Sequence, residues 1–477
     1  MTFIGLDLGT SSLKAILIDA EQRILAEHSV PLTVQRPHDG WSEQDPREWE
    51  NAAVKALSAL GQSADLRDVK GMGISGHMHG ATLLDGAGHV LRPCMLWNDT
   101  RAVNEAAEMD ADPRFREITG NIVFPGFTAP KVEWVRRNEP EVFAKLAQVL
   151  LPKDYLRRIL TGRAASDMSD AAGTAWFDTG ARDWSDTLLS ACHLTRDHMP
   201  DLVEGSQATA RVKGWIGSEA GLPQIVVAGG AGDNAAAAIG AGVVKDGTAF
   251  VSLGTSGVLF AANDAYRPDP ATAVHTFCHA LPDTWHQMGV ILAATDALQW
   301  LSRLTGQSAA ALTADLGGLK APSKTLFLPY LGGERTPHND AQMRGQFLHL
   351  DHATDARAAA RAVLEGVTYA FADCQQALAA TGTQIKSALA LGGGAKSDYW
   401  LSLLATTLNI PLDVPQAGDF GAALGAARLG MMATGADASI ITPPPIAKSV
   451  DPQHDLHDAF AAGHQRYQQA YATLKDL

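Results

Sequence analysis

The sequence predicts an α/β protein built from two related lobes, and two observations lead to this prediction. First, an apolar strand, a Leu-Gly-Thr-Ser turn and a second apolar run occur at residues 4–18 and again at residues 250–261. Second, apolar stretches typical of buried strands alternate with stretches typical of helices. Two hairpins with the same turn about half a chain apart indicate two similar lobes, because the repeats of solenoid proteins have much shorter periods.

The remaining elements follow in chain order. We expect strands at residues 69–75, 224–228, 326–331 and 387–391, and helices at residues 52–60, 234–239, 356–379 and 399–408. The Gly-rich stretch 240–247 marks the boundary, which gives an N-terminal lobe of residues 1–245 and a C-terminal lobe of residues 246–477. Residues 418–427 predict a helix with small residues on one face, which permits close packing. Pro443–Pro445 predict a connector before the last helix.

Composition and charge exclude several classes of function. The 477 residues are 46% hydrophobic and 19% charged, which is typical of a globular protein with two or three domains. A net charge of −14 disfavours nucleic acid and anionic membranes as partners. Four scattered Cys without a CxxC motif, no apolar run of about 18 residues and no signal peptide predict a cytoplasmic protein.

The first turn suggests a site for phosphate and metal. Gly9, Thr10 and Ser11 combine a small residue with hydroxyls, so backbone N–H groups and side chains can approach an anion. Asp7, at the end of the preceding strand, could hold a hydrated Mg²⁺, which prefers carboxylates and water. A plain hairpin turn is the alternative, and the second copy of the turn at Gly254-Thr255 weakens it.

Asp233 follows the second Gly-rich tract, residues 229–232, and precedes an Ala-rich helix. One interpretation is an N-cap, because Asp is among the best capping residues. The other is a general base, since a helix N-terminus favours the carboxylate and phosphoryl transfer to a hydroxyl needs a proton acceptor. The two interpretations are compatible, because capping needs one carboxylate oxygen.

A third Gly-rich tract, residues 392–397, connects a strand to a helix and includes Gly393, Gly394 and Ser397. Its glycines would let a flat ligand such as adenine or ribose pack against bare backbone. The tract matches neither GxGxxG nor GxxxxGK[ST], so a Rossmann dinucleotide site and a P-loop are not supported. A tight strand-to-helix connection is the alternative.

Other polar and aromatic residues suggest a sugar site. Trp97, Asn98 and Arg101 offer an aromatic face, an amide and a guanidinium for a polyhydroxylated ligand, with packing as the alternative. His79 suggests a polar contact to ligand. Residues 275–279 hold two His and one Cys within one turn if helical, but zinc is disfavoured because no companion ligands are visible.

Taken together, the motifs resemble the FGGY family of carbohydrate kinases, in order from about residue 3 to residue 430. The matching tracts are residues 7–12, 41–46, 76–80, 96–99, 126–134, 151–157, 166–174, 232–234, 253–257, 328–331, 333–338 and 392–397. The resemblance implies the actin/hexokinase-type ATPase fold, with two ribonuclease-H-like lobes around a central cleft. It also implies sugar binding mainly on the N-terminal lobe, ATP binding mainly on the C-terminal lobe, and a homodimer.

The resemblance further implies an activity and roles for residues. The activity is ATP- and Mg²⁺-dependent phosphorylation of D-xylulose to D-xylulose 5-phosphate in D-xylose catabolism, with Asp233 as the base for the C5 hydroxyl. Asp7 would assist the metal and phosphate, with Asp233 as a second ligand to Mg²⁺ through water. The implied sugar contacts are Met78, His79 and Asn234; the implied ATP contacts are Gly254, Thr255, Gly393, Gly394 and Ser397.

Two further functions stay open. One is a related kinase acting on ribulose or another ketose or polyol; Met78-His79 disfavours glycerol, since glycerol kinases place an Arg-Glu pair there. The other is an ATPase switch of the actin or chaperone type without a sugar pocket. The chain also departs from the family at His349, where glycine is usual, and at Ala358 or Ala359, where an acidic or amide residue is usual.

Overall fold

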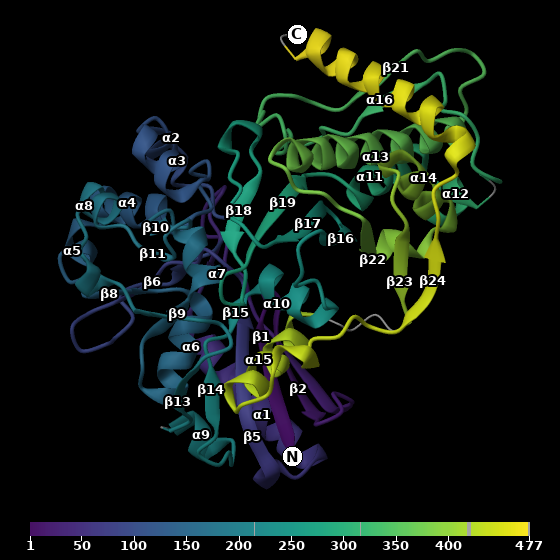
Figure 1. The fold of residues 1–477 in the computed structure, drawn as a ribbon. Helices are drawn as coiled ribbons and strands as arrows, with labels where there is room; N and C mark the ends of the chain where they lie inside the picture. The colour runs from purple at the N-terminus through teal and green to yellow at the C-terminus, as the bar shows by residue number, and fades with distance from the viewer. Residues whose placement is uncertain (214, 315, 417–420, 476–477) are drawn as a thin grey trace. The chain divides into compact units, whose positions relative to one another are not determined.

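The chain forms two compact units. The computed structural model describes residues 1–477 apart from residues 214, 315, 417–420 and 476–477 (Figure 1). Unit 1 consists of Met1–Val244, Phe277–Trp285 and Asp419–Pro443; unit 2 consists of Lys245–Thr276, His286–Gly418 and Pro444–Leu477. Unit 1 therefore includes two segments from the second half of the sequence, beyond the expected boundary at residues 245–246.

The core of unit 1 is a mixed sheet in the order β3-β2-β1-β5-β14-β13. β1 is antiparallel to β2 and parallel to β5, and β14 and β15 are both parallel to β5. The strands are β1 (Thr2–Leu8), β2 (Ser12–Asp19), β3 (Ile24–Pro31), β5 (Val69–Gly76), β13 (Ala208–Arg211), β14 (Val226–Ala228) and β15 (Ala231–Gly232). The expected strands at 69–75 and 224–228 are thus confirmed.

Helices cover both faces of this sheet. Alternate residues of a strand point to opposite faces. Ile4 and Leu6 pack in one cluster with Trp49 of α1 (Pro46–Ser63), whereas Phe3 packs in another with Ala427 of α15 (Ala422–Ala433). The helix predicted at residues 418–427 is therefore present from Ala422, and Gly418–Phe420 lie outside the described residues.

α15 lies unusually close to the sheet because two strand residues lack side chains. A Cβ on Gly5 would lie 1.9 Å from the Ala423 carbonyl oxygen, and a Cβ on Gly73 would lie 1.8 Å from that of Ala426. Because no real Cβ tolerates such distances, glycine at both positions is a condition of this packing. The helix in turn packs on α10 (Asp233–Ala241), which confirms the helix predicted at residues 234–239.

Unit 2 contains a second sheet in the order β18-β19-β17-β16-β22-β23-β24. Its strands are β16 (Thr248–Leu253), β17 (Gly257–Asn263), β18 (His275–Cys278), β19 (Trp285–Ile291), β22 (Ser387–Leu391), β23 (Leu412–Pro415) and β24 (Ile446–Val450). Its helices include α11 (Thr295–Thr305), α12 (Ala309–Thr313), α13 (Ala356–Ala380), α14 (Asp398–Leu408) and α16 (His454–Leu474). The predicted elements at 356–379, 387–391 and 399–408 are confirmed.

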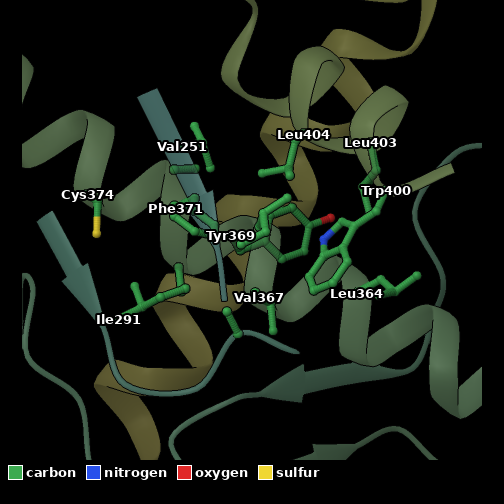
Figure 2. Close-up of a cluster of buried hydrophobic side chains, with 14 of the residues drawn as sticks. Val251, Ile291, Leu364, Val367, Tyr369, Phe371, Cys374, Trp400, Leu403 and Leu404 are labelled. Atoms are coloured by element: carbon green, nitrogen blue, oxygen red, sulfur yellow. The ribbon is translucent and has the colours of Figure 1, made fainter. Parts of the chain in front are cut away.

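The core of unit 2 is centred on α13, which is buried on several sides. Figure 2 shows Val367 and Phe371 of this helix among Val251, Ile291 and Leu404 from neighbouring elements. The buried indole Nε1 of Trp400 donates to the Thr368 hydroxyl at 3.2 Å, so the polar atom of this large side chain is satisfied.

Both predicted hairpins are present. β1 pairs antiparallel with β2 up to Leu8 opposite Leu13, and β16 pairs with β17 up to Leu253 opposite Gly257. Each first strand is also parallel to a further strand, β5 in unit 1 and β22 in unit 2. The repeated turn therefore marks the same strand arrangement in each unit.

The segment after Pro445 belongs to unit 2. β24 pairs with β23, and α16 packs against α13 and α14. The imidazole Nε2 of His464 lies 2.7 Å from Asp373 Oδ1, and the Gln453 amide donates to Thr406 at 3.1 Å. Within the part of the chain that the structure describes, no helix has the length and apolar character needed to cross a membrane.

Local structure differs from expectation at two places. Residues 275–278 form a strand and not a helical turn. Glu43–Gln44, within the matching tract 41–46, form a short strand, β4, which pairs with β7 (Cys94–Met95). Among residues 326–331, only Leu326–Leu328 form a strand, β20, which pairs with β21 (Gln346–Leu348).

His349 follows β21 in a left-handed conformation, with φ of 58°. A side chain in this region costs about 1–2 kcal/mol, whereas glycine adopts it freely. The missing glycine therefore strains the backbone locally, without disrupting β21.

We expect His349→Gly to stabilise the protein by roughly 0.5–1 kcal/mol, because the side chain is exposed and only the backbone strain is relieved. Denaturant unfolding monitored by circular dichroism measures this change. The control is His352→Gly, a neighbouring exposed position outside the left-handed region, which should destabilise or have no effect. Equal effects of the two substitutions would contradict the strain argument.

Candidate functional site

Two carboxylates meet at one edge of the unit 1 sheet. Asp7 lies near the end of β1, opposite Ser75 of β5. On the other side of β5, β15 pairs at Ser75 and Gly76 and leads directly into Asp233, the first residue of α10. Because parallel strands end at the same edge, Asp7 and Asp233 lie close enough to interact electrostatically.

Burial and mutual repulsion shape the protonation of this pair. Burial, and then the charge of Asp7, raise the pKa of Asp233 to about 7, against two hydrogen bonds from Asn234 that lower it. Burial also raises the pKa of Asp7, opposed by the Ser75 hydroxyl, which donates at 2.8 Å, and by the charge of Lys14. Ionisation of both Asp7 and Asp233 is therefore energetically unfavourable when the site is free of ligand.

The donor chemistry of this pair fits a hydrated divalent cation. Carboxylate oxygens and water are the ligands that Mg²⁺ prefers, and a bound cation would offset the repulsion that raises the pKa of Asp233. The backbone N–H and the side-chain amide of Asn234 both donate to Asp233 Oδ1, at 2.7 and 3.0 Å, so that among the described residues Oδ2 is left for a ligand.

The Asp233 side chain does not cap α10; the N-cap residue is Gly232. Of the two interpretations of this residue, capping is thus not realised. A Cβ on Gly232 would lie 2.8 Å from Met78 Cγ, so Met78 packs directly against the peptide that precedes Asp233.

His79 lies beside Met78 in a constrained conformation. Neither His77 nor His79 is on a strand, because β5 ends at Gly76. His79 has φ of 71°, its Nδ1 lies 2.7 Å from the Gly173 carbonyl, and its ring stacks on Phe127 with centroids 4.7 Å apart. The buried ammonium of Lys131 donates to the His79 carbonyl at 3.0 Å, which holds this conformation.

The loop of Trp97, Asn98 and Arg101 is tied to the first turn. The indole of Trp97 is half exposed, and its Nε1 donates to Thr10 Oγ1 at 3.0 Å. The turn is held further by Gln44 Nε2, which donates to the Thr10 carbonyl at 2.7 Å. Asn98 Oδ1 is buried with no hydrogen-bond partner among the described residues, and so is suited to accept from a ligand.

Arg101 is engaged within the protein. Its guanidinium pairs with Asp99 at 2.6 Å and Glu43 at 2.7 Å, and lies 3.5 Å from the centroid of the Trp41 ring. Its side chain is only 1% exposed. This geometry gives Arg101 a role in holding the loop, and its contact to a sugar stays a prediction.

In unit 2, the second copy of the turn is anchored to α11. The Gly254 carbonyl accepts from the backbone and the hydroxyl of Thr295, at 2.9 and 2.8 Å, and the Thr255 carbonyl accepts from the Ala294 amide at 2.9 Å. In these hydrogen bonds the carbonyl groups of the turn are the acceptors. The backbone N–H groups of the turn take no part in them.

Gly393, Gly394 and Ser397 line a cavity of about 680 Å³ in unit 2. A Cβ on Gly393 would meet nothing within 4 Å, so bare backbone faces open space. Ser397 is the N-cap of α14, where its hydroxyl accepts from the Trp400 amide at 3.3 Å. A cavity of this size matches a drug-sized ligand such as a nucleoside.

The sequence did not reveal most of the cavity wall. It includes Thr295 and Gln299 of α11, Ala309 and Thr313 of α12, and Tyr399 of α14. These residues belong to ordinary helices without a motif, so only their convergence in space identifies them. No motif identified Ser75 either; its hydroxyl positions Asp7 from a neighbouring strand.

Comparison with known proteins agrees with this arrangement. Residues 2–240 match the N-terminal domain model of the FGGY family of carbohydrate kinases, and residues 249–434 match the C-terminal domain model. The chain is 47% identical to "Xylulose kinase" of Escherichia coli (strain K12), covering 100% of this chain and 99% of that protein. It is 36% identical to "Xylulose kinase" of Bacillus subtilis (strain 168), covering 91% and 88%.

Solved structures are similar over the whole chain. A crystal structure described as a "xyloylose kinase" from Brucella ovis has a TM-score of 0.98 and 56% identity and covers 100% of both chains. The xylulose kinase from Rhodospirillum rubrum has a TM-score of 0.93 and 28% identity, covering 100% of this chain and 99% of that chain.

We expect Asp233→Asn to raise the melting temperature of the metal-free protein by a few degrees at pH 8.5 and by less at pH 5. The folded pKa is about 7 and the unfolded value 3.8, so ionisation costs the folded state increasingly as pH rises between them. Asparagine keeps the acceptor for Asn234 and removes the charge. Differential scanning calorimetry in EDTA measures the shift.

The exposed Asp68→Asn serves as the control, and should show no such pH-dependent gain. A gain for Asp233→Asn that is equal at the two pH values would contradict the proposed repulsion.

Proposed function

The chain belongs to the FGGY family of carbohydrate kinases, and from this premise we propose that it transfers the γ-phosphoryl group of ATP to the C5 hydroxyl of D-xylulose. The predicted fold, two α/β lobes of the actin/hexokinase ATPase type, is confirmed by both family models and the similar structures. The observation that carries the proposal is the pairing of Asp7 with Asp233 beside Met78 and His79.

Asp233 is the base in this proposal. A general base is most effective when its pKa is near the working pH, and the pKa of Asp233 is about 7. Its Oδ1 is occupied by both hydrogen bonds from Asn234, so Oδ2 is the atom available to take the sugar proton. The bonds from Asn234 also fix the rotation of the carboxylate, which keeps Oδ2 oriented.

Asp7 and Asp233 would hold Mg²⁺ through water. A bound Mg²⁺ neutralises negative charge on the transferring phosphates. The Ser75 hydroxyl orients Asp7, and the Gly9-Thr10-Ser11 turn offers backbone N–H groups and hydroxyls to phosphate oxygens.

The remaining contacts divide between the lobes. We assign the sugar to residues 1–245, through Met78, His79, Trp97, Asn98, Arg101 and Asn234. We assign ATP mainly to residues 246–477, with Gly254 and Thr255 at the phosphates and Gly393, Gly394 and Ser397 at the adenosine. The 680 Å³ cavity supports the adenosine assignment.

We place the protein in the cytoplasm, and its free thiols support this proposal. Cys94, Cys192, Cys278 and Cys374 are free and buried, which fits the reducing cytoplasm. A homodimer stays a prediction.

The test is ADP release with ATP and Mg²⁺ in the presence of D-xylulose, D-ribulose, L-ribulose or glycerol. We expect turnover to be strongest with D-xylulose and to fall by about 10²–10⁴-fold in Asp233→Asn, while ATP affinity stays unchanged. A preference for a ribulose would support the related kinase instead. ADP release that is independent of sugar would support the ATPase switch and contradict the proposal.

The adenosine assignment gives a separate prediction. Gly393→Val should raise the KM for ATP by about 10-fold or more and leave the KM for D-xylulose unchanged, because the new side chain fills open space in the cavity. The matched control is Gly332→Val, another unit 2 glycine with open space around its Cβ and outside the cavity lining. An unchanged KM for ATP in Gly393→Val would contradict the assignment of adenosine to this cavity.

A further inference from the structure

A buried ionic cluster lies under the turn that leads into Asp233, and the proposed function does not use it. The ammonium of Lys153 lies 2.5 Å from Asp154 Oδ1, 2.7 Å from Asp167 Oδ1 and 3.2 Å from Asp170 Oδ2. Arg157 pairs with Asp154 at 3.3 Å. All five side chains are fully buried. They come from α6 (Pro152–Thr161), β9 (Ala165–Asp167) and α7 (Met168–Ala171).

Such a cluster is costly to bury. Desolvation of each ion costs several kcal/mol, and well-packed apolar residues often serve stability as well or better. The cluster has two cations and three carboxyl groups, and burial raises the pKa of Asp170 well above its usual range.

It holds the turn of residues 229–232 at both ends. At the first end, Arg157 Nη2 donates to the Gly229 carbonyl. At the second end, the Gly232 amide donates to Ser169 Oγ at 3.1 Å. The Ser169 hydroxyl itself donates to Asp167 Oδ2 at 2.5 Å, and the other oxygen of Asp167 is paired with Lys153.

The hydrogen bond between the Gly232 amide and Ser169 Oγ is the contact that lies next to the proposed base, Asp233. Gly232 is the residue immediately before Asp233, and it is held both by its pairing with Gly76 of β5 and by its hydrogen bond to Ser169. Met78 packs directly against Gly232, because a Cβ on Gly232 would lie 2.8 Å from Met78 Cγ. The chain Lys153–Asp167–Ser169–Gly232 thus sets the position from which the Asp233 carboxylate projects.

We propose that Ser169 is a positioning residue for Asp233, carrying the fixed geometry of the Lys153–Asp167 ion pair to the backbone that presents the base. This inference rests on the proposed function, in which Asp233 accepts the sugar proton. A base misplaced by an ångström loses much of its effect, since proton transfer needs hydrogen-bond geometry with the substrate hydroxyl.

The experiment compares Ser169→Ala with Ser166→Ala in the full-length enzyme. Ser166 is equally buried on the adjacent strand β9, and its hydroxyl has no hydrogen-bond partner within the described chain, so it controls for removing a buried hydroxyl. We expect Ser169→Ala to lower kcat with D-xylulose about 10-fold while both KM values stay within twofold, and Ser166→Ala to keep the wild-type kcat. Ser169→Thr, which keeps the hydroxyl, should recover most of the lost kcat.

Three results would overturn the proposal: wild-type kcat in Ser169→Ala, an equal loss in Ser166→Ala, or a Ser169→Thr variant that melts like wild type and remains as slow as Ser169→Ala. If Ser169→Thr does not fold, the comparison of the two alanine variants still decides. Asp233→Asn separates this inference from the proposed function. Its retention of full activity would remove the base assignment itself, whereas an inactive Asp233→Asn beside a fully active Ser169→Ala would remove only the role of Ser169.

Discussion

The structure of unit 1 depends on the pairing of β5 with β1 on one side and with β15 on the other. These parallel ladders bring two residues 226 positions apart in the sequence, Asp7 and Asp233, to one sheet edge. The same strands carry a second constraint, because α15 packs this closely on the sheet only where Gly5 and Gly73 leave room for its carbonyls. A side chain at either position would push the helix away from the strands that carry the site.

The site combines two kinds of buried charge with opposite character. The Asp7–Asp233 pair is electrostatically unfavourable in the free protein: burial first, and then the charge of Asp7, raise the pKa of Asp233 to about 7. The cluster around Lys153 is internally paired and lies under the same turn. The Asp7–Asp233 pair leaves negative charge that a ligand would compensate. The cluster around Lys153 pairs its charges within the protein and so forms a rigid support for the turn that leads into Asp233.

Unit 2 contains the same hairpin in a different structural setting. Its turn at Gly254 is held by α11, and the cavity opens between α11, α12 and the start of α14. The buried core around α13 and the docking of α16 through His464 and Asp373 hold these helices in place. The cavity is therefore a product of helix packing, with the Gly-rich turn supplying one bare wall.

The sequence by itself determined the features that depend on neighbouring residues. The two hairpins, the start of α10 at Asp233 and the helix over residues 356–379 were predictable, because turn chemistry and apolar periodicity act within a few residues. The family of the chain was also readable, since its motifs stand in order along the sequence. Only the tertiary structure decided which partner each polar side chain finds. The sequence predicts Arg101 to bind a ligand, but its guanidinium is paired with Asp99 and Glu43. Ser169 lies in the matching tract 166–174, but the sequence does not show that its hydroxyl accepts from the Gly232 amide. Hydrogen bonds and ion pairs join atoms that are distant in sequence, and no local pattern encodes those distances.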